Sequence, residues 1–354
     1  MRNIFGLAKE DLAQWVAEQG EKPYRAQQIA RALHRLGCLH PSFMTDVPMK
    51  ARESLLRDFS WDLPKLLQEK VAADGTRKWV LGLDEKNAIE TIFIPEEGRG
   101  TLCVSTQAGC AIGCPFCATG AGGFSRNLKA HEILAQVLLA KQFLREEGQG
   151  IVTNIVFMGM GEPLLNLENL LVALSWLADD DGHAISRRRL TVSTSGIVPA
   201  MEALSRAHPV ALAVSLHAAR DALRDVLVPL NRKYPLSVLL DACRRYARVA
   251  PKGRLMLEYT LLAGVNDTSK DARELGRLAK SIPALVNLIP FNPHPQSDYK
   301  APAAERVLAF QEVLQKEGTM TRIRKTRGDP IAAACGQLRG KVDDITCRSR
   351  ARSA

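Results

Sequence analysis

Three closely spaced cysteines are the residues of this sequence best suited to chemistry. Cys110, Cys114 and Cys117 follow the spacing C-x3-C-x2-C within the short segment GCAIGCPFCATG. Three thiolates on one loop can bind three irons of a [4Fe-4S] cluster, which leaves the fourth iron without a protein ligand. The amino and carboxylate groups of S-adenosylmethionine can bind that iron. An electron from the cluster can then cleave the bound molecule and release a 5′-deoxyadenosyl radical.

A zinc site is the alternative interpretation of these cysteines, in a non-catalytic, zinc-stabilised RNA-binding protein. Structural zinc usually takes four protein ligands in paired C-x2-C groups. The chain has eight cysteines, but no second pair follows the triplet. The position of the triplet, at the first strand of a strand–helix alternation, favours the iron–sulfur cluster. The remaining cysteines are Cys38, Cys103, Cys243, Cys335 and Cys347.

The elements that must position the triplet alternate between strand and helix from residue 101 onward. Strands are predicted at 102–106, 153–158, 189–194, 211–217, 255–261, 286–289 and 321–325. Helices are predicted at 129–145, 167–177, 199–207, 238–247, 271–281 and 303–316. This alternation predicts an α/β fold whose parallel sheet curves into a partial or full (β/α) barrel. Active sites of such barrels lie at the carboxyl ends of the strands.

Residues 1–60 are predicted to be helical, most clearly at 11–19 and 24–36. We interpret the basic face of the second helix as solvated, with an accessory RNA-binding surface as the alternative. The side chains of this face are Arg25, Arg31, His34 and Arg35.

Residues 61–100 have a different character. The pair Asp74-Gly75 predicts a hairpin turn, followed by strands at 78–83 and 88–94. Glu90 interrupts the second of these strands, AIETIFI, and Pro95 with the segment EEGRG is expected to end it.

We therefore expect four parts. They are a helical accessory domain (1–60), a β-hairpin extension (61–100), a barrel core (101–340) and a basic C-terminal tail (341–354).

Composition narrows the functional class. The chain has 354 residues, of which 46% are hydrophobic and 24% charged, as in ordinary globular proteins. No apolar run approaches the roughly 18 residues of a membrane helix. Glu10 and Asp11 interrupt the start of the chain, so we expect no signal peptide and a cytoplasmic location. The net charge of +10 favours a nucleic-acid partner, with a basic surface kept for solubility as the alternative.

Six motifs in order resemble one enzyme family. They are CVSTQAGCAIGCPFCATG, GMGEPLLN, STSG, SLHA, PFNPHP and RGDPIAAACGQLRG. The triplet resembles the radical S-adenosylmethionine (radical SAM) superfamily. The six together resemble its RlmN family of RNA methyltransferases, which methylate adenine at carbon 2. The likeness extends from about Tyr24 to Arg339.

This resemblance implies a set of residues that bind S-adenosylmethionine. Small polar residues at successive strand ends converge on one cup in a parallel barrel. His217 taken alone is more often a satisfied core histidine than a ligand. The implied binding residues are Gly161, Glu162, Ser193, Ser215, Leu216, His217 and Asn292.

The resemblance also implies three catalytic residues. Cys335 accepts a methyl group from one S-adenosylmethionine, and a second molecule supplies the radical that joins this methyl carbon to adenine. Cys103 then breaks the resulting protein–RNA crosslink and forms a disulfide with Cys335. Glu90 is the implied proton acceptor, and its alternative is a solvent-facing residue of an amphipathic strand.

Basic residues near Cys335 are candidates for holding RNA phosphates. The family's substrates are an adenosine in the peptidyl-transferase region of 23S rRNA and the adenosine 3′ of the anticodon in tRNA. We also expect a flavodoxin-type electron donor and a monomeric enzyme. A Cfr-type enzyme, which methylates carbon 8, is the close alternative. The basic residues are Arg322, Arg324, Lys325, Arg327, Arg339, Lys341, Arg348, Arg350 and Arg352.

Overall fold

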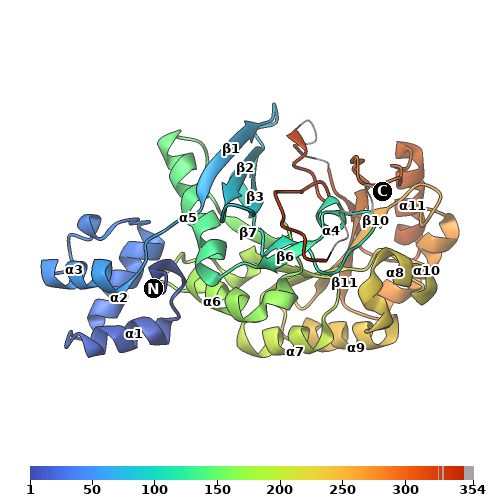
Figure 1. Cartoon of the computed structure of the whole chain (residues 1–354). Coiled ribbons are helices and arrows are strands. Elements are labelled where there is room, and N and C mark those ends of the chain that lie inside the picture. Colours follow the sequence, from blue (N-terminus) through green and yellow to red (C-terminus); the bar gives the residue numbers. More distant parts are fainter. Residues whose placement is uncertain (326, 329–330, 347–354) are drawn as a thin grey trace.

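The computed structural model describes residues 1–325, 327–328 and 331–346. Its centre is a ten-stranded sheet in the order β1-β2-β3-β4-β7-β8-β9-β10-β11-β12. Strands β4 and β7 to β12 pair in parallel, whereas β1 to β4 pair antiparallel. The sheet ends at β1 and β12 without closing, so the α/β prediction is confirmed in the form of a partial barrel (Figure 1).

The strands of this sheet are β1 Lys65–Val71, β2 Arg77–Gly82, β3 Ala88–Glu96, β4 Arg99–Cys103, β7 Asn154–Phe157, β8 Leu190–Thr194, β9 Ala211–Ser215, β10 Leu255–Leu261, β11 Ala284–Pro290 and β12 Thr321–Ile323. A separate two-stranded sheet pairs β5 Gln107–Gly109 with β6 Phe124–Asn127. The helices of the core are α4 Ala118–Ala121, α5 Ala130–Glu146, α6 Leu167–Ala178, α7 Val198–Ala207, α8 Asp221–Leu227, α9 Leu236–Ala247, α10 Ser269–Lys280 and α11 Ala304–Lys316.

The predicted alternation follows from burial. Helix α5 buries Ile133, Leu134, Val137 and Leu138, whose helical spacing places them on one face against the sheet. Strand β10 occupies the predicted range 255–261, because its residues are buried on both faces of a parallel sheet. The described part of the chain contains no helix long and apolar enough to cross a membrane.

Several elements differ from the prediction. Strand β1 was missed, because six of its seven residues are exposed and show no alternation of polar and apolar side chains. Strand β3 continues through Pro95 to Glu96 instead of ending at Ile94, and pairs there with the start of β4. Strand β12 ends at Ile323, two residues earlier than expected.

Three helices form the N-terminal part, α1 Lys9–Glu18, α2 Tyr24–Ala30 and α3 Met49–Asp58. They lie at one end of the molecule, blue in Figure 1, and contact the core near α5 and α6. The solvated-face interpretation is wrong for two residues. The Arg25 guanidinium is buried and donates to the Asp46 carbonyl at 3.0 Å. The buried His34 ring stacks on Trp176 of α6, with ring centroids 4.5 Å apart.

The region 61–100 is continuous with the core, because β1, β2 and β3 extend the same sheet through β4. The turn at Asp74-Gly75 lies between β1 and β2, as predicted. The four-part division of the chain stays a prediction. Of the basic tail, 341–346 is described, whereas Cys347, Arg348, Arg350 and Arg352 lie outside the described residues.

Candidate active site

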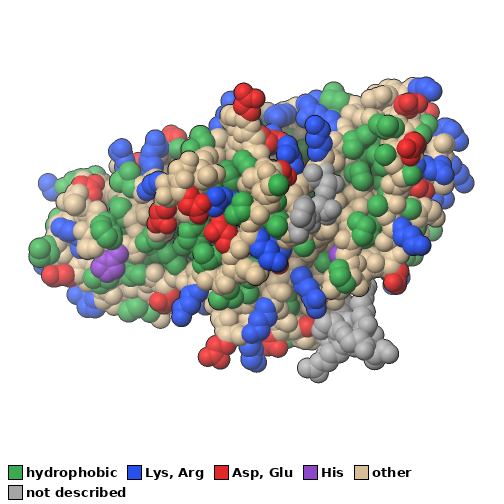
Figure 2. All heavy atoms as spheres, turned by 90° about the horizontal axis from the view of Figure 1, so that it is seen from above, with side chains coloured by type: hydrophobic (Ala, Val, Ile, Leu, Met, Phe, Trp, Pro, Cys, Tyr) green, Lys and Arg blue, Asp and Glu red, His purple; other side chains and the backbone are tan. Residues whose placement is uncertain are grey.

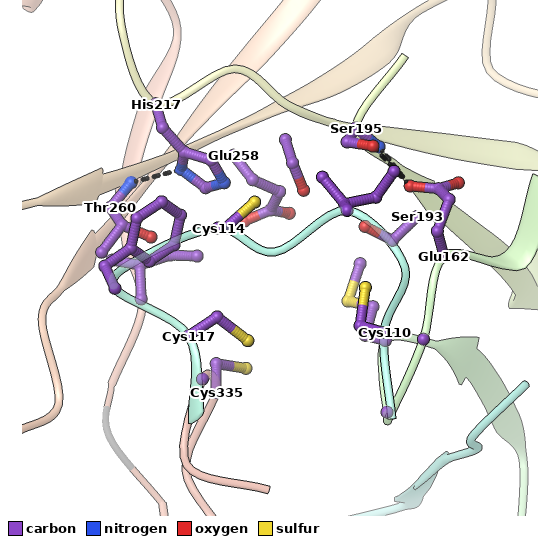
Figure 3. A pocket seen from close by; sticks show the side chains of 18 of the residues that line it. Cys110, Cys114, Cys117, Glu162, Ser193, Ser195, His217, Glu258, Thr260 and Cys335 are labelled. Carbon is purple, nitrogen blue, oxygen red and sulfur yellow. Dashed lines mark hydrogen bonds between the residues drawn. The ribbon is translucent and has the colours of Figure 1, made fainter. Parts of the chain in front are cut away.

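A cavity opens at the carboxyl ends of the parallel strands (Figure 3). It holds about 950 Å³ of empty space, part of it continuous with solvent. Its lining includes the cysteine triplet, Cys335 and most of the predicted cofactor residues. Six of those seven line it: Gly161, Glu162, Ser193, Ser215, His217 and Asn292.

The cysteine loop is held by the small β5–β6 sheet. The Cys110 amide donates to the Gly123 carbonyl at 2.7 Å, and the Cys117 amide donates to the Cys114 carbonyl at 3.2 Å. Gly109, with φ +82°, allows the chain to turn into the loop, because a Cβ there would lie 2.2 Å from the Gly123 oxygen. All three thiols of the triplet therefore face one cavity from a fixed loop (Figure 3).

The chemistry of this loop fits an iron–sulfur cluster. Burial, followed by repulsion from Cys117, raises the pKa of the Cys110 thiol to about 12. Burial and the two neighbouring thiols raise the pKa of Cys114 well above its usual value. Bound iron would supply the positive charge that keeps such thiols ionised. Among the described residues, no three potential ligands converge on one metal ion. A cluster instead spreads its three cysteines over three irons.

The GMGE turn after β7 forms one wall of the cavity. Gly161 has φ +104°, and a Cβ there would lie 2.6 Å from the Gln107 side chain, so only glycine fits. The Glu162 amide donates to the Gln107 side-chain oxygen at 2.9 Å. The Glu162 carboxylate accepts from the amide and the hydroxyl of Ser195, both at 2.7 Å. Burial raises the pKa of Glu162, and the two Ser195 hydrogen bonds oppose that shift.

His217 lies on the opposite side of the cavity. Its Nδ1 accepts from the Thr260 amide at 3.0 Å, so the neutral ring carries its proton on Nε2 (Figure 3). Burial, and then the charge of Arg224, lower the pKa of His217 to about 3. The residue is buried and hydrogen-bonded as a core histidine would be, and it also lines the cavity. Leu216 is fully buried and does not line the cavity, so its predicted cofactor contact stays a prediction.

Cys335 reaches this cavity on the segment of residues 331–346, which we call the C-terminal segment. The Ala118 amide donates to the Gly336 carbonyl at 2.8 Å, directly beside the cysteine loop. The Asn292 side chain donates to the Cys335 carbonyl at 3.1 Å. Burial raises the pKa of Cys335, Arg324 opposes that shift, and Glu258 and then Cys117 add to it. Figure 3 shows the thiols of Cys117 and Cys335 as neighbours.

Comparison with known proteins agrees with this site. Residues 104–276 match the model of the radical SAM superfamily. A solved radical SAM methyltransferase from Sphaerobacter thermophilus is 41% identical, with a TM-score of 0.89, covering 96% of this chain and 99% of that chain. The chain belongs to the radical SAM methyltransferases. Membership implies a [4Fe-4S] cluster and S-adenosylmethionine, and it excludes the alternative of a non-catalytic zinc protein.

The N-terminal helices match a second family model. Residues 2–60 match the ribosomal RNA large subunit methyltransferase N-terminal domain. Two more distant structures align with part of the chain at TM-scores below 0.5. Streptococcus suis SuiB bound to S-adenosylmethionine is 13% identical over 64% of this chain and 50% of that chain, with a TM-score of 0.44. A domain of pyruvate-formate lyase-activating enzyme from Bacteroides vulgatus is 20% identical over 49% of this chain and 99% of that chain, with a TM-score of 0.38.

In this radical SAM methyltransferase, Cys103 lies at the end of β4, buried beneath the cavity wall. Burial, and then the Cys335 thiol, raise the pKa of Cys103 to about 12, whereas Arg324 opposes the shift. Cys335 is therefore close enough to Cys103 to influence its charge, and Arg324 influences both thiols. Both are free thiols in the structure, and Cys103 itself does not line the cavity.

Glu90 lies on β3, on the same face as Ile92, which pairs with Cys103. The Gly340 amide of the C-terminal segment donates to its Oε1 at 3.3 Å. Its Oε2 lies 3.6 Å from the Lys78 ammonium, and it has no hydrogen-bond partner among the described residues. Glu90 is only 8% exposed, so the alternative of a solvent-facing residue is wrong. It does not line the cavity, and its role as proton acceptor stays a prediction.

Sequence reasoning missed a carboxylate inside the cavity. Glu258, in the middle of β10, accepts from the Asn287 side chain at 2.8 Å through Oε2. Its buried Oε1 has no hydrogen-bond partner among the described residues. Burial raises the pKa of Glu258, and Arg324 opposes the shift. The acidic residue within LMLEYTL was a signal of the same kind as Glu90 in its strand.

Arg324 was predicted to meet RNA phosphates, but it lines the cavity together with Cys335. A second, smaller hollow adjoins the cavity and shares Arg324, Asn292 and Cys335 with it. Lys325 and Arg327 line only that outer hollow. Viewed from above, lysine and arginine side chains gather around a hollow in the surface (Figure 2). The basic stretch therefore runs from the outer hollow to Cys335.

Proposed function

We propose that this radical SAM methyltransferase methylates carbon 2 of adenosine in RNA, in the peptidyl-transferase region of 23S rRNA and 3′ of the anticodon in tRNA. The observation that carries the proposal is the position of Cys335. This thiol lines the same cavity as the three cysteines of the triplet, on a segment hydrogen-bonded to Ala118, the residue after Cys117. The N-terminal match to a ribosomal RNA methyltransferase domain supports RNA as the substrate.

Cys110, Cys114 and Cys117 would hold the cluster, and the polar residues around Glu162 and His217 would hold S-adenosylmethionine. When bound, the cluster supplies the electron that cleaves S-adenosylmethionine to methionine and a 5′-deoxyadenosyl radical. Apolar side chains of the lining, such as Phe116 and Phe157, would limit the access of water to that radical. Two molecules of S-adenosylmethionine are used in each turnover, one as methyl donor and one as radical source.

Cys335 is the residue that carries the methyl carbon. Carbon 2 of adenine is electron-poor and cannot attack the methyl group of S-adenosylmethionine directly. The Cys335 thiolate can, because sulfur is the most nucleophilic common side-chain atom. It displaces S-adenosylhomocysteine and becomes a methyl thioether. Loss of one hydrogen atom to the 5′-deoxyadenosyl radical leaves a carbon radical on Cys335, which adds to carbon 2 of adenine.

Release of the product requires a second thiol and a base. The adduct would give up one electron, and the oxidised cluster held by Cys110, Cys114 and Cys117 would be the acceptor. Glu90 would accept the proton on carbon 2. The Cys103 thiolate then attacks the Cys335 sulfur, the carbon–sulfur bond breaks, and the departing carbon takes a proton to become the new methyl group. The product is a Cys103–Cys335 disulfide. A cellular dithiol reductant must reduce this bond before the next turnover.

The target adenine must leave its stack to reach Cys335, so a loop or bulge is the expected substrate. We propose that it enters through the outer hollow, past Lys325 and Arg327, whose charges hold the flanking phosphates. The electron donor would be a flavodoxin-type protein, and the enzyme would act as a monomer. A reducing compartment such as the cytoplasm suits its free thiols.

An anaerobic assay of the iron–sulfur-loaded protein with ribosomal and transfer RNA tests the proposal. Mass spectrometry should detect 2-methyladenosine in the RNA and a methyl group on Cys335. Changing Cys103 to alanine should trap a protein–RNA crosslink. The matched control is Cys243→Ala, which removes another buried free thiol and should leave methylation unchanged. Finding 8-methyladenosine would assign the Cfr-type reaction, and finding no modified base with a loaded cluster would overturn the proposal.

A further inference from the structure

A buried arginine lies behind the cavity wall. Arg224 of α8 is fully buried, with a relative exposure of 0%. Its Nε donates to the Leu216 carbonyl at 3.1 Å, and its Nη2 donates to the carbonyls of Ser195 at 2.7 Å and Ser215 at 3.1 Å. Its Nη1 donates to the Asn231 side-chain oxygen at 2.8 Å. One rigid guanidinium therefore joins the ends of two neighbouring strands, β8 and β9.

The carbonyls that Arg224 holds belong to the wall of the cavity. The side chains of Ser195 and Ser215 both line the cavity. Ser195 also donates both of its hydrogen bonds to the Glu162 carboxylate, so its position fixes that carboxylate as well. Because the guanidinium is planar, its fork sets the spacing between the two strand ends. Loss of the fork would change the shape of the wall without removing a side chain that touches the cofactor.

The hydrogen bonds of Arg224 go to carbonyl oxygens and to Asn231 and not to a carboxylate, although Asp221 and Asp225 act on its charge from a distance. Asp221 and Asp225 are the nearest acidic residues on α8, but both accept from the Asn231 amide group instead. Among the described residues, none forms an ion pair with Arg224. Burial lowers the pKa of Arg224 to about 10, with the Cys114 thiol as the largest opposing influence. The group is therefore a cation at neutral pH. Leu227 of the same short helix belongs to an apolar cluster against which Cys114 packs, so α8 and the cysteine loop lie in contact with one cluster.

We propose that Arg224 is a positioning residue with two separable effects. Its hydrogen bonds hold the Ser195–Ser215 wall of the S-adenosylmethionine site, and its buried charge favours the reduced form of the cluster bound by Cys114. Reduction adds one negative charge to the cluster. A cation in the low-dielectric interior stabilises that added charge, so it makes the reduction potential less negative.

Two substitutions separate these effects. Arg224→Lys keeps the positive charge but cannot make the forked hydrogen bonds. Arg224→Met removes both the charge and the donors. Arg77 offers a matched control, because it is a buried arginine on β2 that pairs with Glu69 and Glu147 and does not line the cavity. Arg77→Lys and Arg77→Met should change stability alone.

The test uses the anaerobically reconstituted enzyme without RNA. Potentiometric titration, followed by electron paramagnetic resonance, gives the cluster potential, and equilibrium dialysis gives the affinity for S-adenosylmethionine. Both Arg224 variants should bind at least about tenfold more weakly, as expected when charge-assisted hydrogen bonds to the wall are lost. Only Arg224→Met should have a more negative potential. Neither readout depends on which RNA or which carbon is methylated.

If Arg224→Met has the wild-type cluster potential, the proposal that the charge of Arg224 favours the reduced cluster is wrong. If both variants bind S-adenosylmethionine with wild-type affinity, the proposal that its hydrogen bonds hold the binding wall is wrong. If Arg224→Met does not retain its cluster, Arg224→Gln replaces it as the uncharged variant with amide donors. Asn231→Ala adds a milder case, because it frees one edge of the guanidinium and keeps the charge. It should weaken S-adenosylmethionine binding and leave the potential unchanged.

Discussion

The cofactor cup and the C-terminal segment are built in different ways, although they meet in one cavity. The cup consists of strand ends in a parallel sheet, with fully buried residues such as Leu216 and Arg224 behind it. The C-terminal segment crosses the cup's edge with little regular structure, a single β-bridge joining Ala88 to Lys341. It is held by individual hydrogen bonds to α4, directly after the cysteine loop, and to β3.

This difference in construction fits two different roles, generation of the radical in the cup and the reactions of Cys335 on the C-terminal segment. A radical source needs groups fixed within the rigid core, and strands joined to neighbours on both sides provide them. In the proposed reaction, Cys335 accepts a methyl group, bonds to RNA and is then attacked by a second thiol, so it must change its partners during turnover. A segment held by separate hydrogen bonds can accommodate those steps without disturbing the sheet.

The largest expected effect is loss of the cluster, which should follow from a substitution in the cysteine loop and not from one in the C-terminal segment. Cys114→Ala should remove the iron–sulfur cluster and all methylation, because two thiols cannot hold the cluster that three hold. Cys335→Ala should leave the cluster, its visible spectrum and S-adenosylmethionine binding intact, while methylation is lost. Iron content, absorbance and nucleoside mass spectrometry measure these outcomes. If Cys335→Ala also loses its cluster, the two regions are not separable.

The next effect concerns the cup alone. Gly161→Ala should weaken S-adenosylmethionine binding by at least about tenfold, because the new Cβ would lie 2.6 Å from Gln107 at a φ of +104°. Gly264→Ala is the control, since Gly264 has φ +70° but no atom within 4 Å of its added Cβ. Equilibrium dialysis compares the two. Equal binding by both variants would show that crowding against Gln107 does not shape the site.

Acid should lower the free energy of unfolding through histidines that are buried in the folded core, and the C-terminal segment contains no such group. Burial lowers the pKa of His34 and of His217 to about 3, and that of His183 well below its usual value. In the unfolded chain these histidines bind protons below about pH 6.5. Their contribution to the free energy of unfolding is therefore fully present above that pH and is lost as the pH falls toward 3. Each histidine contributes a slope of about 1.4 kcal/mol per pH unit in this window.

Thermal unfolding between pH 7.5 and 5 measures this dependence. His34→Phe keeps a ring against Trp176 and removes one titrating group, so its unfolding free energy should depend less steeply on pH. The described part of the C-terminal segment contains no histidine. A wild-type slope in His34→Phe would contradict the assignment.

These two regions also differ in how far the sequence predicted them. The strand–helix alternation and the cup followed from apolar runs and from polar residues at strand ends, which are local patterns. The proximity of Cys103 and Glu90 depends on the pairing of β3 with β4, and no spacing within either strand encodes that register. Arg324 was grouped with the basic residues near Cys335 that were expected to hold RNA phosphates, in a strand predicted to end at residue 325. The strand ends at Ile323, and Arg324 lines the cavity.

Arg224 shows a second limit of sequence reasoning. It stands on a short helix, α8, that showed no clear periodic pattern, and its hydrogen-bond acceptors are backbone carbonyls. Because every residue has a backbone carbonyl, the residue types do not show which carbonyls accept hydrogen bonds from Arg224. Such contacts become visible only when the strands that carry the carbonyls are placed side by side.

The smallest predicted effect measures how firmly the C-terminal segment is held. The Thr119 hydroxyl donates to the Leu338 carbonyl at 2.6 Å, in a buried contact between α4, which follows the cysteine loop, and the segment. Thr119→Val keeps the shape but removes the donor. The lost hydrogen bond is worth about 1 kcal/mol, so the population of released segment should rise about fivefold. The rate at which iodoacetamide alkylates Cys335 in the metal-free protein should rise by the same factor. Thr268→Val removes a comparable hydroxyl from the start of α10 and should leave that rate unchanged. An unchanged rate in Thr119→Val would mean that the remaining hydrogen bonds hold the segment as firmly as the strands hold the cup.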